Sequence, residues 1–132
     1  MLRFLIAAPF ILHGLAHLSG FLGAWSTAQV GFSDRPWLLS SGITLRSSLG
    51  RAFGLLWLIA MMALLGTGFG VLFRQAWWPL LAIVASVISL TVIAPWWNTV
   101  PPGARFGALF DLVVILVLLT PWKDRIVEAV GR

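Results

Sequence analysis

The sequence contains no cysteine, and only four of its 132 residues are acidic. The missing cysteine excludes disulfides, thiol redox chemistry, iron–sulfur clusters and haem attached through cysteine. Charged residues make up 10% of the chain and hydrophobic residues 60%, with a mean hydropathy of +0.98. Because a soluble domain of this size cannot bury so much apolar surface, the composition predicts a single integral membrane domain over residues 1–132.

Basic residues outnumber acidic ones, and the formal net charge is +5. The basic residues form no run or patch of the kind that binds nucleic acid, so no nucleic-acid partner is predicted. In a membrane protein, we attribute this charge to contact with the anionic headgroups of the lipid bilayer.

Four long apolar stretches predict an all-α fold, a bundle of four transmembrane helices arranged up-down-up-down. They cover residues 2–24, 50–73, 76–94 and 104–122. About 20 residues at 1.5 Å per residue cross a hydrocarbon core of ~30 Å, and a helix satisfies its own backbone groups there. Tryptophans stand at the ends of these stretches, as an aromatic belt requires: Trp25, Trp77, Trp78, Trp96, Trp97 and Trp122.

The basic residues favour cytoplasmic chain termini by a small margin. Four crossings put both termini on one side of the membrane. The predicted terminal side carries Arg3, Arg74, Lys123, Arg125 and Arg132, and the other side carries Arg35, Arg46, Arg51 and Arg105. The positive-inside rule prefers the side with more basic residues as the cytoplasmic one.

The first apolar stretch could alternatively be a signal peptide. Arg3 gives it a basic start, and Ser26 and Ala28 are small residues in a cleavage-like context. The stretch is long for a signal peptide, and His13 and His17 interrupt it. We therefore favour a membrane-spanning helix.

Away from the ends of the predicted spans, the ionisable side chains are His13, His17 and Asp111. A titratable group inside hydrocarbon is costly and needs a partner, so each is a candidate functional residue. His13 and His17 are four residues apart and therefore share one face of a helix.

Residue counting predicts one polar layer across the bundle. His17 lies seven residues before the end of the first stretch, and Asp111 lies seven residues after the start of the fourth. Both lie roughly 10 Å below the same membrane surface at 1.5 Å per residue. Trp57 and Ser89 fall in the same layer, with His13 one turn deeper. We predict that His17 or His13 forms a hydrogen bond with Asp111.

Two interpretations of this layer stay open. In one, the histidine–aspartate pair is an interhelix tie that fixes the register of the bundle. In the other, it is a proton-relay or ligand-anchoring site, because histidine titrates near neutral pH and aspartate can orient it. Trp57 would then wall the pocket. Arg105 could attract an anionic head group to its mouth, or only extend to the membrane interface.

The residues predict no metal site, no resident cofactor and no catalytic residues. Two histidines at this spacing can bind one metal, but only Asp111 could join them, and metal sites use three or four ligands. A bis-histidine haem needs histidines on two helices, so haem is disfavoured. Enzymatic activity has the least support, because the sequence has no nucleophile motif, phosphate loop or cofactor signature.

Residues 10–21 read F-I-L-H-G-L-A-H-L-S-G-F. They resemble the first helix of a family of small bacterial membrane proteins that carries H-G-x-x-H followed by L-x-G-F. Further similarities lie in residues 54–58, 86–90, 96–97 and 105–107. That family has no assigned function and is similar in layout to the four-helix DoxX-like proteins, which are loosely tied to quinone-linked redox chemistry; this wider link is an analogy of fold. The family often carries asparagine at the position of Asp111, so the carboxyl group here is a departure.

The resemblance implies a protein of the bacterial inner (plasma) membrane that binds a quinone, a lipid or another small amphipathic ligand beside the polar layer. The alternative is a structural or accessory subunit that packs against a membrane protein partner or a second copy of itself. An open cavity beside His13 and His17 would favour the first function. A sealed pair with outward-facing glycines would favour the second.

Overall fold

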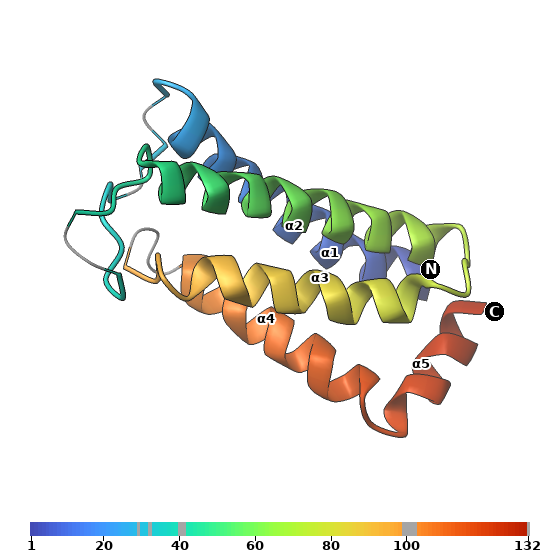
Figure 1. The fold of residues 1–132 in the computed structure, drawn as a ribbon. Coiled ribbons are helices and arrows are strands. Elements are labelled where there is room, and N and C mark those ends of the chain that lie inside the picture. The colour runs from blue at the N-terminus through green and yellow to red at the C-terminus, as the bar shows by residue number, and fades with distance from the viewer. Residues whose placement is uncertain (29, 32, 40–41, 99–102, 132) are drawn as a thin grey trace.

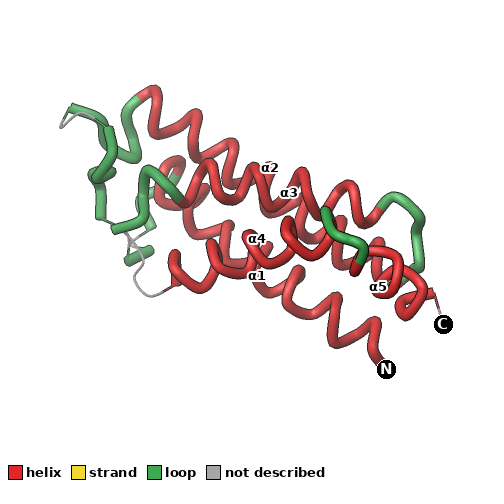
Figure 2. The backbone as a smooth tube through the Cα atoms, turned by 90° about the horizontal axis from the view of Figure 1, so that it is seen from below, coloured by secondary structure: helices red, strands yellow, loops and turns green. Residues whose placement is uncertain are grey.

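The computed structural model describes residues 1–28, 30–31, 33–39, 42–98 and 103–131, and over them the chain forms five helices and no β-strand (Figure 1). These are α1 (Leu2–Trp25), α2 (Ser48–Leu72), α3 (Trp78–Ile93), α4 (Gly103–Leu118) and α5 (Trp122–Gly131). The first four lie side by side as a bundle, and both chain termini lie at the same end of it (Figures 1 and 2). The all-helical bundle predicted from hydropathy is confirmed.

Consecutive helices pack on one another, and the contact between α1 and α2 is the most extensive. Glycines allow this close approach, since a side chain at Gly20 would overlap the ring of Trp57. At Gly54, an added Cβ would lie 2.6 Å from the Cβ of Ala24. The glycines at this interface therefore face the partner helix and not the surroundings.

The start of α2 is fixed by a serine cap and a close loop crossing. Ser47 Oγ accepts a hydrogen bond from the Gly50 amide at 3.2 Å and donates one to the Thr44 carbonyl at 2.7 Å. The loop passes so near that a Cβ at Gly50 would collide with the Thr44 carbonyl oxygen. Glycine is required there for space.

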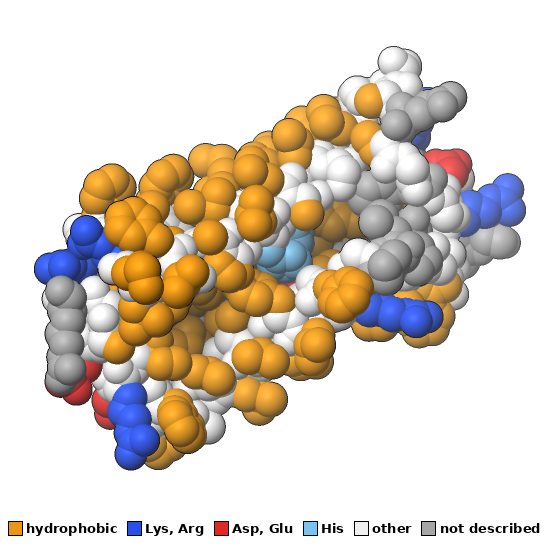
Figure 3. All heavy atoms as spheres, turned by 180° about the vertical axis from the view of Figure 1, so that it is seen from behind, with side chains coloured by type: hydrophobic (Ala, Val, Ile, Leu, Met, Phe, Trp, Pro, Cys, Tyr) orange, Lys and Arg blue, Asp and Glu red, His pale blue; other side chains and the backbone are white. Residues whose placement is uncertain are grey.

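The outward faces of the bundle are apolar. Figure 3 shows hydrophobic side chains covering most of the surface seen from behind. Exposed large residues include Leu12, Leu15, Leu55, Ile59, Leu109 and Leu116. α1 and α2 are long and apolar enough to cross a membrane, and the bent pair α4–α5 would make a third span if taken as one, whereas α3 has 16 residues. These features fit an integral membrane protein.

The helix that begins the predicted fourth span ends before the predicted boundary of that span. The prediction carried it to Trp122, but α4 ends at Leu118, and Trp122 begins α5 at 96° to α4. The break falls at Thr120, whose hydroxyl donates to the Val117 carbonyl at 2.9 Å, and at Pro121, which has no amide to continue the helix. Hydropathy does not register that break, because the residues around it remain apolar.

The helix α5 turns across the end of the bundle, at 96° to α4. Val130 is buried in the main hydrophobic core, and Ile126 and Val127 pack against that core. Its charged residues Lys123, Asp124, Arg125 and Glu128 are exposed. An amphipathic helix therefore covers the end of the bundle that holds the chain termini (Figure 1).

The aromatic-belt prediction fails for two of its six tryptophans. Trp25, Trp77, Trp97 and Trp122 are exposed, as a position at a membrane interface requires. Trp78 is buried in the main core. Trp96 is buried against Trp57 and Phe53, with ring centroids 5.3 and 4.8 Å away. Position at a helix end does not determine which way a side chain points.

Candidate functional site

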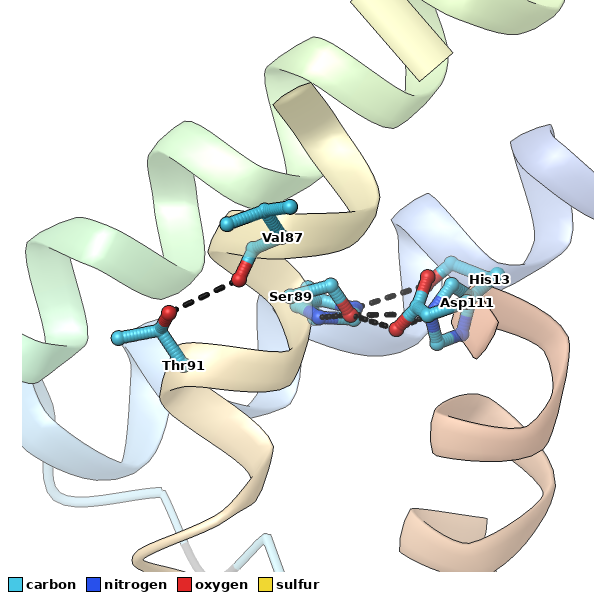
Figure 4. A network of polar contacts seen from close by, with 6 residues as sticks. His13, Val87, Ser89, Thr91 and Asp111 are labelled. Carbon is cyan, nitrogen blue, oxygen red and sulfur yellow. Dashed lines mark hydrogen bonds and ion pairs between the residues drawn. The ribbon is translucent and has the colours of Figure 1, made fainter. Parts of the chain in front are cut away.

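Three helices bring four polar side chains together inside the bundle. His13 and His17 come from α1, Ser89 from α3 and Asp111 from α4. Asp111 and Ser89 are fully buried, His17 is nearly so, and the His13 side chain is 12% exposed. The group is called the polar cluster below, and Figure 4 shows it from close by.

Ser89 is the junction of the polar cluster. Its hydroxyl donates to Asp111 Oδ2 at 2.5 Å and lies 2.9 Å from His17 Nε2. His13 Nε2 lies 3.1 Å from the same hydroxyl and 3.2 Å from Asp111 Oδ2. The predicted histidine–aspartate hydrogen bond is confirmed, and His13 makes it. The sequence pattern did not predict that one hydroxyl links α3 to both α1 and α4.

A helix backbone fixes the tautomer of His17. Its Nδ1 lies 3.0 Å from the His13 carbonyl oxygen, which can only accept, so Nδ1 carries the hydrogen. The ring therefore directs Nε2 toward Ser89. The spacing of four residues makes this bond possible, because the carbonyl of residue i lies beside residue i+4.

The ring of His13 fits against α4 because residue 107 is glycine. A Cβ at Gly107 would lie 2.7 Å from Cε1 of His13 and 3.4 Å from its Nδ1. Phe110 covers another side of the ring, with centroids 5.2 Å apart, and also packs on Phe10. Gly107 and Phe110 thus support the position of the His13 ring. The sequence feature that could have predicted them is that both lie within about one helical turn of Asp111.

A pocket of about 310 Å³ opens beside the polar cluster. Its described lining residues are His13, Leu15, Ala16, His17, Ser19, Trp57, Ile93, Trp96, Gly103 and Ala104. Figure 3 shows the histidine surface at the bottom of a hollow in an otherwise apolar face. The pocket thus combines apolar walls with two imidazole groups, a composition typical of small-molecule sites.

The other predicted site residues take separate positions. Trp57 lines the pocket, as predicted for its wall. Arg105 is exposed on the first turn of α4 and is not among the described residues that line the pocket. Trp96, expected at the membrane interface, is a pocket wall instead. Its role was missed because its place at a helix end resembles that of a belt residue.

The polar cluster is suited to holding protons or hydrogen-bonding a ligand. Its members touch one another directly, so a proton can be shared among a carboxyl, a hydroxyl and an imidazole. Within the described part of the chain, no three His, Asp or Glu residues are arranged to hold a metal ion. The contacts that join its members are hydrogen bonds.

No protein family, curated protein or solved structure matches the chain. The resemblance of residues 10–21 to a family with DoxX-like layout therefore stays a prediction.

Proposed function

We propose that this protein crosses the bilayer four times and binds a small amphipathic ligand, such as a quinone or a lipid, in the pocket beside the polar cluster. The proposal includes the up-down-up-down order, a DoxX-like layout and a bacterial inner membrane with cytoplasmic termini. The observation that carries it is the open pocket with His13 and His17 at its base. An open cavity at this point is what a binding site needs and an interhelix tie does not.

The four crossings are supported by the packing and by the chain ends. α1 and α2 have 24 and 25 residues. α3 and α4 have 16 each, about 24 Å at 1.5 Å per residue, and they pack beside the longer pair. Both termini at one end of the bundle agree with an even number of crossings (Figure 1). Short helices can be accommodated by local thinning of the bilayer.

The ligand class is supported by the pocket walls. Trp57, Trp96 and Ile93 supply apolar and aromatic surface, and the two histidines supply the polar groups. A molecule with an apolar body and one polar head matches this division. The volume of about 310 Å³ lies at the lower end of the range for ligand pockets.

A structural or accessory subunit is the second candidate. Asp111 is fully buried and joins α4 to α1 and α3 through His13 and Ser89, as an interhelix tie would. This role explains the buried part of the cluster but leaves the pocket unexplained. The glycines that would face outward in such a subunit instead face neighbouring parts of the bundle: Gly54 meets Ala24 of α1, Gly70 meets Trp78 of α3 and Gly107 meets His13.

The test is native mass spectrometry and absorption spectroscopy of the detergent-purified protein, beside its His17→Ala variant. We expect a quinone, lipid or other apolar small molecule to co-purify with the wild type and to be lost from the variant. Thr91→Ala is the matched control, since the Thr91 hydroxyl bonds its own helix at the Val87 carbonyl and points away from the polar cluster (Figure 4).

A second variant separates loss of ligand from loss of fold. Ala16→Phe adds a ring at a lining residue that is exposed and outside the polar cluster. It should displace the ligand while thermal unfolding stays near the wild-type temperature. Wild-type protein that carries nothing, together with an Ala16→Phe variant that behaves identically, would favour the accessory-subunit function.

A further inference from the structure

When Asp111 is ionised and His17 is neutral, the polar cluster has fewer hydrogens than it has hydrogen-bond contacts. Ser89 has one hydroxyl hydrogen, but its oxygen lies within hydrogen-bond distance of both Asp111 Oδ2 and His17 Nε2. His17 already has its hydrogen on Nδ1, facing the His13 carbonyl. With an ionised Asp111 and a neutral His17, one of the two Ser89 contacts would therefore set lone pair against lone pair.

One additional proton satisfies every contact. It can reside on His17 Nε2, which then donates to Ser89 while Ser89 donates to Asp111. It can equally reside on Asp111 Oδ2, which then donates to Ser89 while Ser89 donates to His17 Nε2. Both arrangements make the cluster electrically neutral, and a neutral cluster suits the complete burial of Asp111 and Ser89.

This proton count also fixes the tautomer of His13. The protons between Ser89 and its two neighbours are then assigned, so His13 Nε2 must itself donate to the two oxygens beside it. The side-chain hydrogen bonds of His13 among the described residues both run through Nε2. A neutral His13 therefore carries a lone pair on Nδ1, on the ring edge beside Gly107. The His13 side chain is 12% exposed and lines the pocket, so a ligand there can approach this ring.

We infer that the ligand is an uncharged amphipathic molecule whose hydroxyl group donates a hydrogen bond to His13 Nδ1. A hydroquinone and a free long-chain alcohol share this chemistry, whereas an oxidised quinone offers only acceptors to the same atom. The inference rests on the proposed function, because it assigns the polar end of the ligand in that pocket. The inference goes beyond the proposed function because it specifies that the polar group of the ligand donates a hydrogen bond and carries no charge.

An anionic head group is disfavoured by the same pocket. None of its ten described lining residues is a lysine or an arginine. The exposed Arg105 lies outside that lining. A carboxylate or phosphate placed against a neutral cluster and apolar walls would lose hydration without gaining a counter-charge.

The test uses redox-inert probes, two of which differ only in whether the oxygen carries a hydrogen or a methyl group. Binding of 4-octylphenol and of its methyl ether, 4-octylanisole, is measured by native mass spectrometry titration of the full chain in detergent. We expect the phenol to bind about tenfold more tightly, since the ether keeps the apolar body but cannot donate. 4-Octylbenzoate, with a charged head on the same body, should bind more weakly than the phenol.

The outcomes separate this inference from the proposed function. If none of the probes binds, the proposed pocket function fails. If the phenol and the ether bind equally, or the benzoate binds most tightly, the pocket function stands and the hydroxyl inference is overturned. A second pair, 1-decanol and 1-methoxydecane, distinguishes a long-chain alcohol from a hydroquinone as the ligand. A larger difference in affinity within this pair indicates an aliphatic alcohol. A larger difference within the first pair indicates a phenolic head group.

Asp111→Asn tests the proton count itself. With its nitrogen toward the cluster, the introduced amide donates to Ser89 and to His13 Nε2, while Ser89 donates to His17 Nε2. The hydrogen of His13 then moves to Nδ1, and only the 3.1 Å contact between His13 Nε2 and Ser89 Oγ is left without a hydrogen. We expect the preference for phenol over anisole to fall from about tenfold to near unity, because Nδ1 no longer accepts. A preference that persists in this variant would mean that another group recognises the hydroxyl.

A second variant acts on the ring edge and removes no polar atom of the cluster. Gly107→Ala sets a methyl group 2.7 Å from Cε1 and 3.4 Å from Nδ1 of His13, so it should also reduce the preference for phenol. Thr91→Ala is again the control, and the wild-type preference should be unchanged in it.

Discussion

Helix α1 makes two different kinds of contact, with α2 on one side and with α4 on the other. Against α2 it packs closely and extensively through glycines such as Gly20 and Gly54. Its backbone approaches α4 closely at far fewer points, and the two helices meet through the polar cluster and the ring contact between Phe10 and Phe110. The glycine contact closes the space between helices, whereas the polar contact joins them at one depth and leaves the pocket beside it.

The polar contact should be broken most severely by Asp111→Ala. This variant leaves Ser89 and His13 without their shared acceptor in a buried position, and we expect a loss of about 3 kcal/mol of unfolding free energy. Asp111→Asn should lose less than about 1 kcal/mol, because an amide can replace the lost hydrogen bonds. Chemical unfolding in mixed detergent would measure both; equal losses would mean that the cavity left by the side chain, and not its polarity, sets the cost.

The glycine contact should be broken by Gly20→Ala. The added Cβ would overlap the Trp57 ring, so α1 and α2 must separate, with an expected cost of about 2 kcal/mol. Gly42→Ala is the matched control, since an added Cβ there has no described atom within 4 Å. If the two variants unfold alike in the same assay, the close helix contact is not a source of stability.

The smallest effect is expected at the junction of the polar contact. Ser89→Ala removes the hydroxyl that joins His17 to Asp111 and should cost about 1 kcal/mol, typical of a hydrogen bond between helices in lipid. Thr91→Ser removes only a methyl group two residues away and should cost less than about 0.5 kcal/mol. The pair is compared by thermal unfolding monitored by circular dichroism, and no difference between them would argue against a stabilising role for the junction.

The two kinds of contact also differ in how far the sequence predicts them. Counting residues from the ends of the apolar stretches was sufficient to bring His17, Ser89 and Asp111 to one depth, because the helical rise is constant. It could not assign the direct bond to His13 over His17, since the rotation of each helix about its axis depends on the packing of its neighbours. The close α1–α2 contact depends on which glycine meets which ring, and small residues alone do not specify that pairing.

The remaining differences come from the ends of helices. Hydropathy carried the fourth span through Pro121 because it counts apolar residues and not backbone amides. Hydropathy also predicted that Trp96 is a membrane anchor. In the structure, the loop that precedes α2 is bonded to Ala94 and Pro95, the two residues before Trp96. Trp37 donates from its backbone amide to the Pro95 carbonyl at 3.1 Å and from Nε1 to the Ala94 carbonyl at 2.6 Å. Contacts between such distant loops have no local signal in a sequence.

These two Trp37 bonds fasten the longest loop to the backbone just before Trp96, a wall of the pocket. The same loop is also held by the buried side chain of Leu45, which packs with Trp57 and Trp96, and by the side-chain amide of Asn98, which donates to the Arg35 carbonyl. Natural versions of the protein should therefore keep an indole at position 37. The segment is a site at which evolution can alter the approach to the pocket while the helices beneath it stay the same.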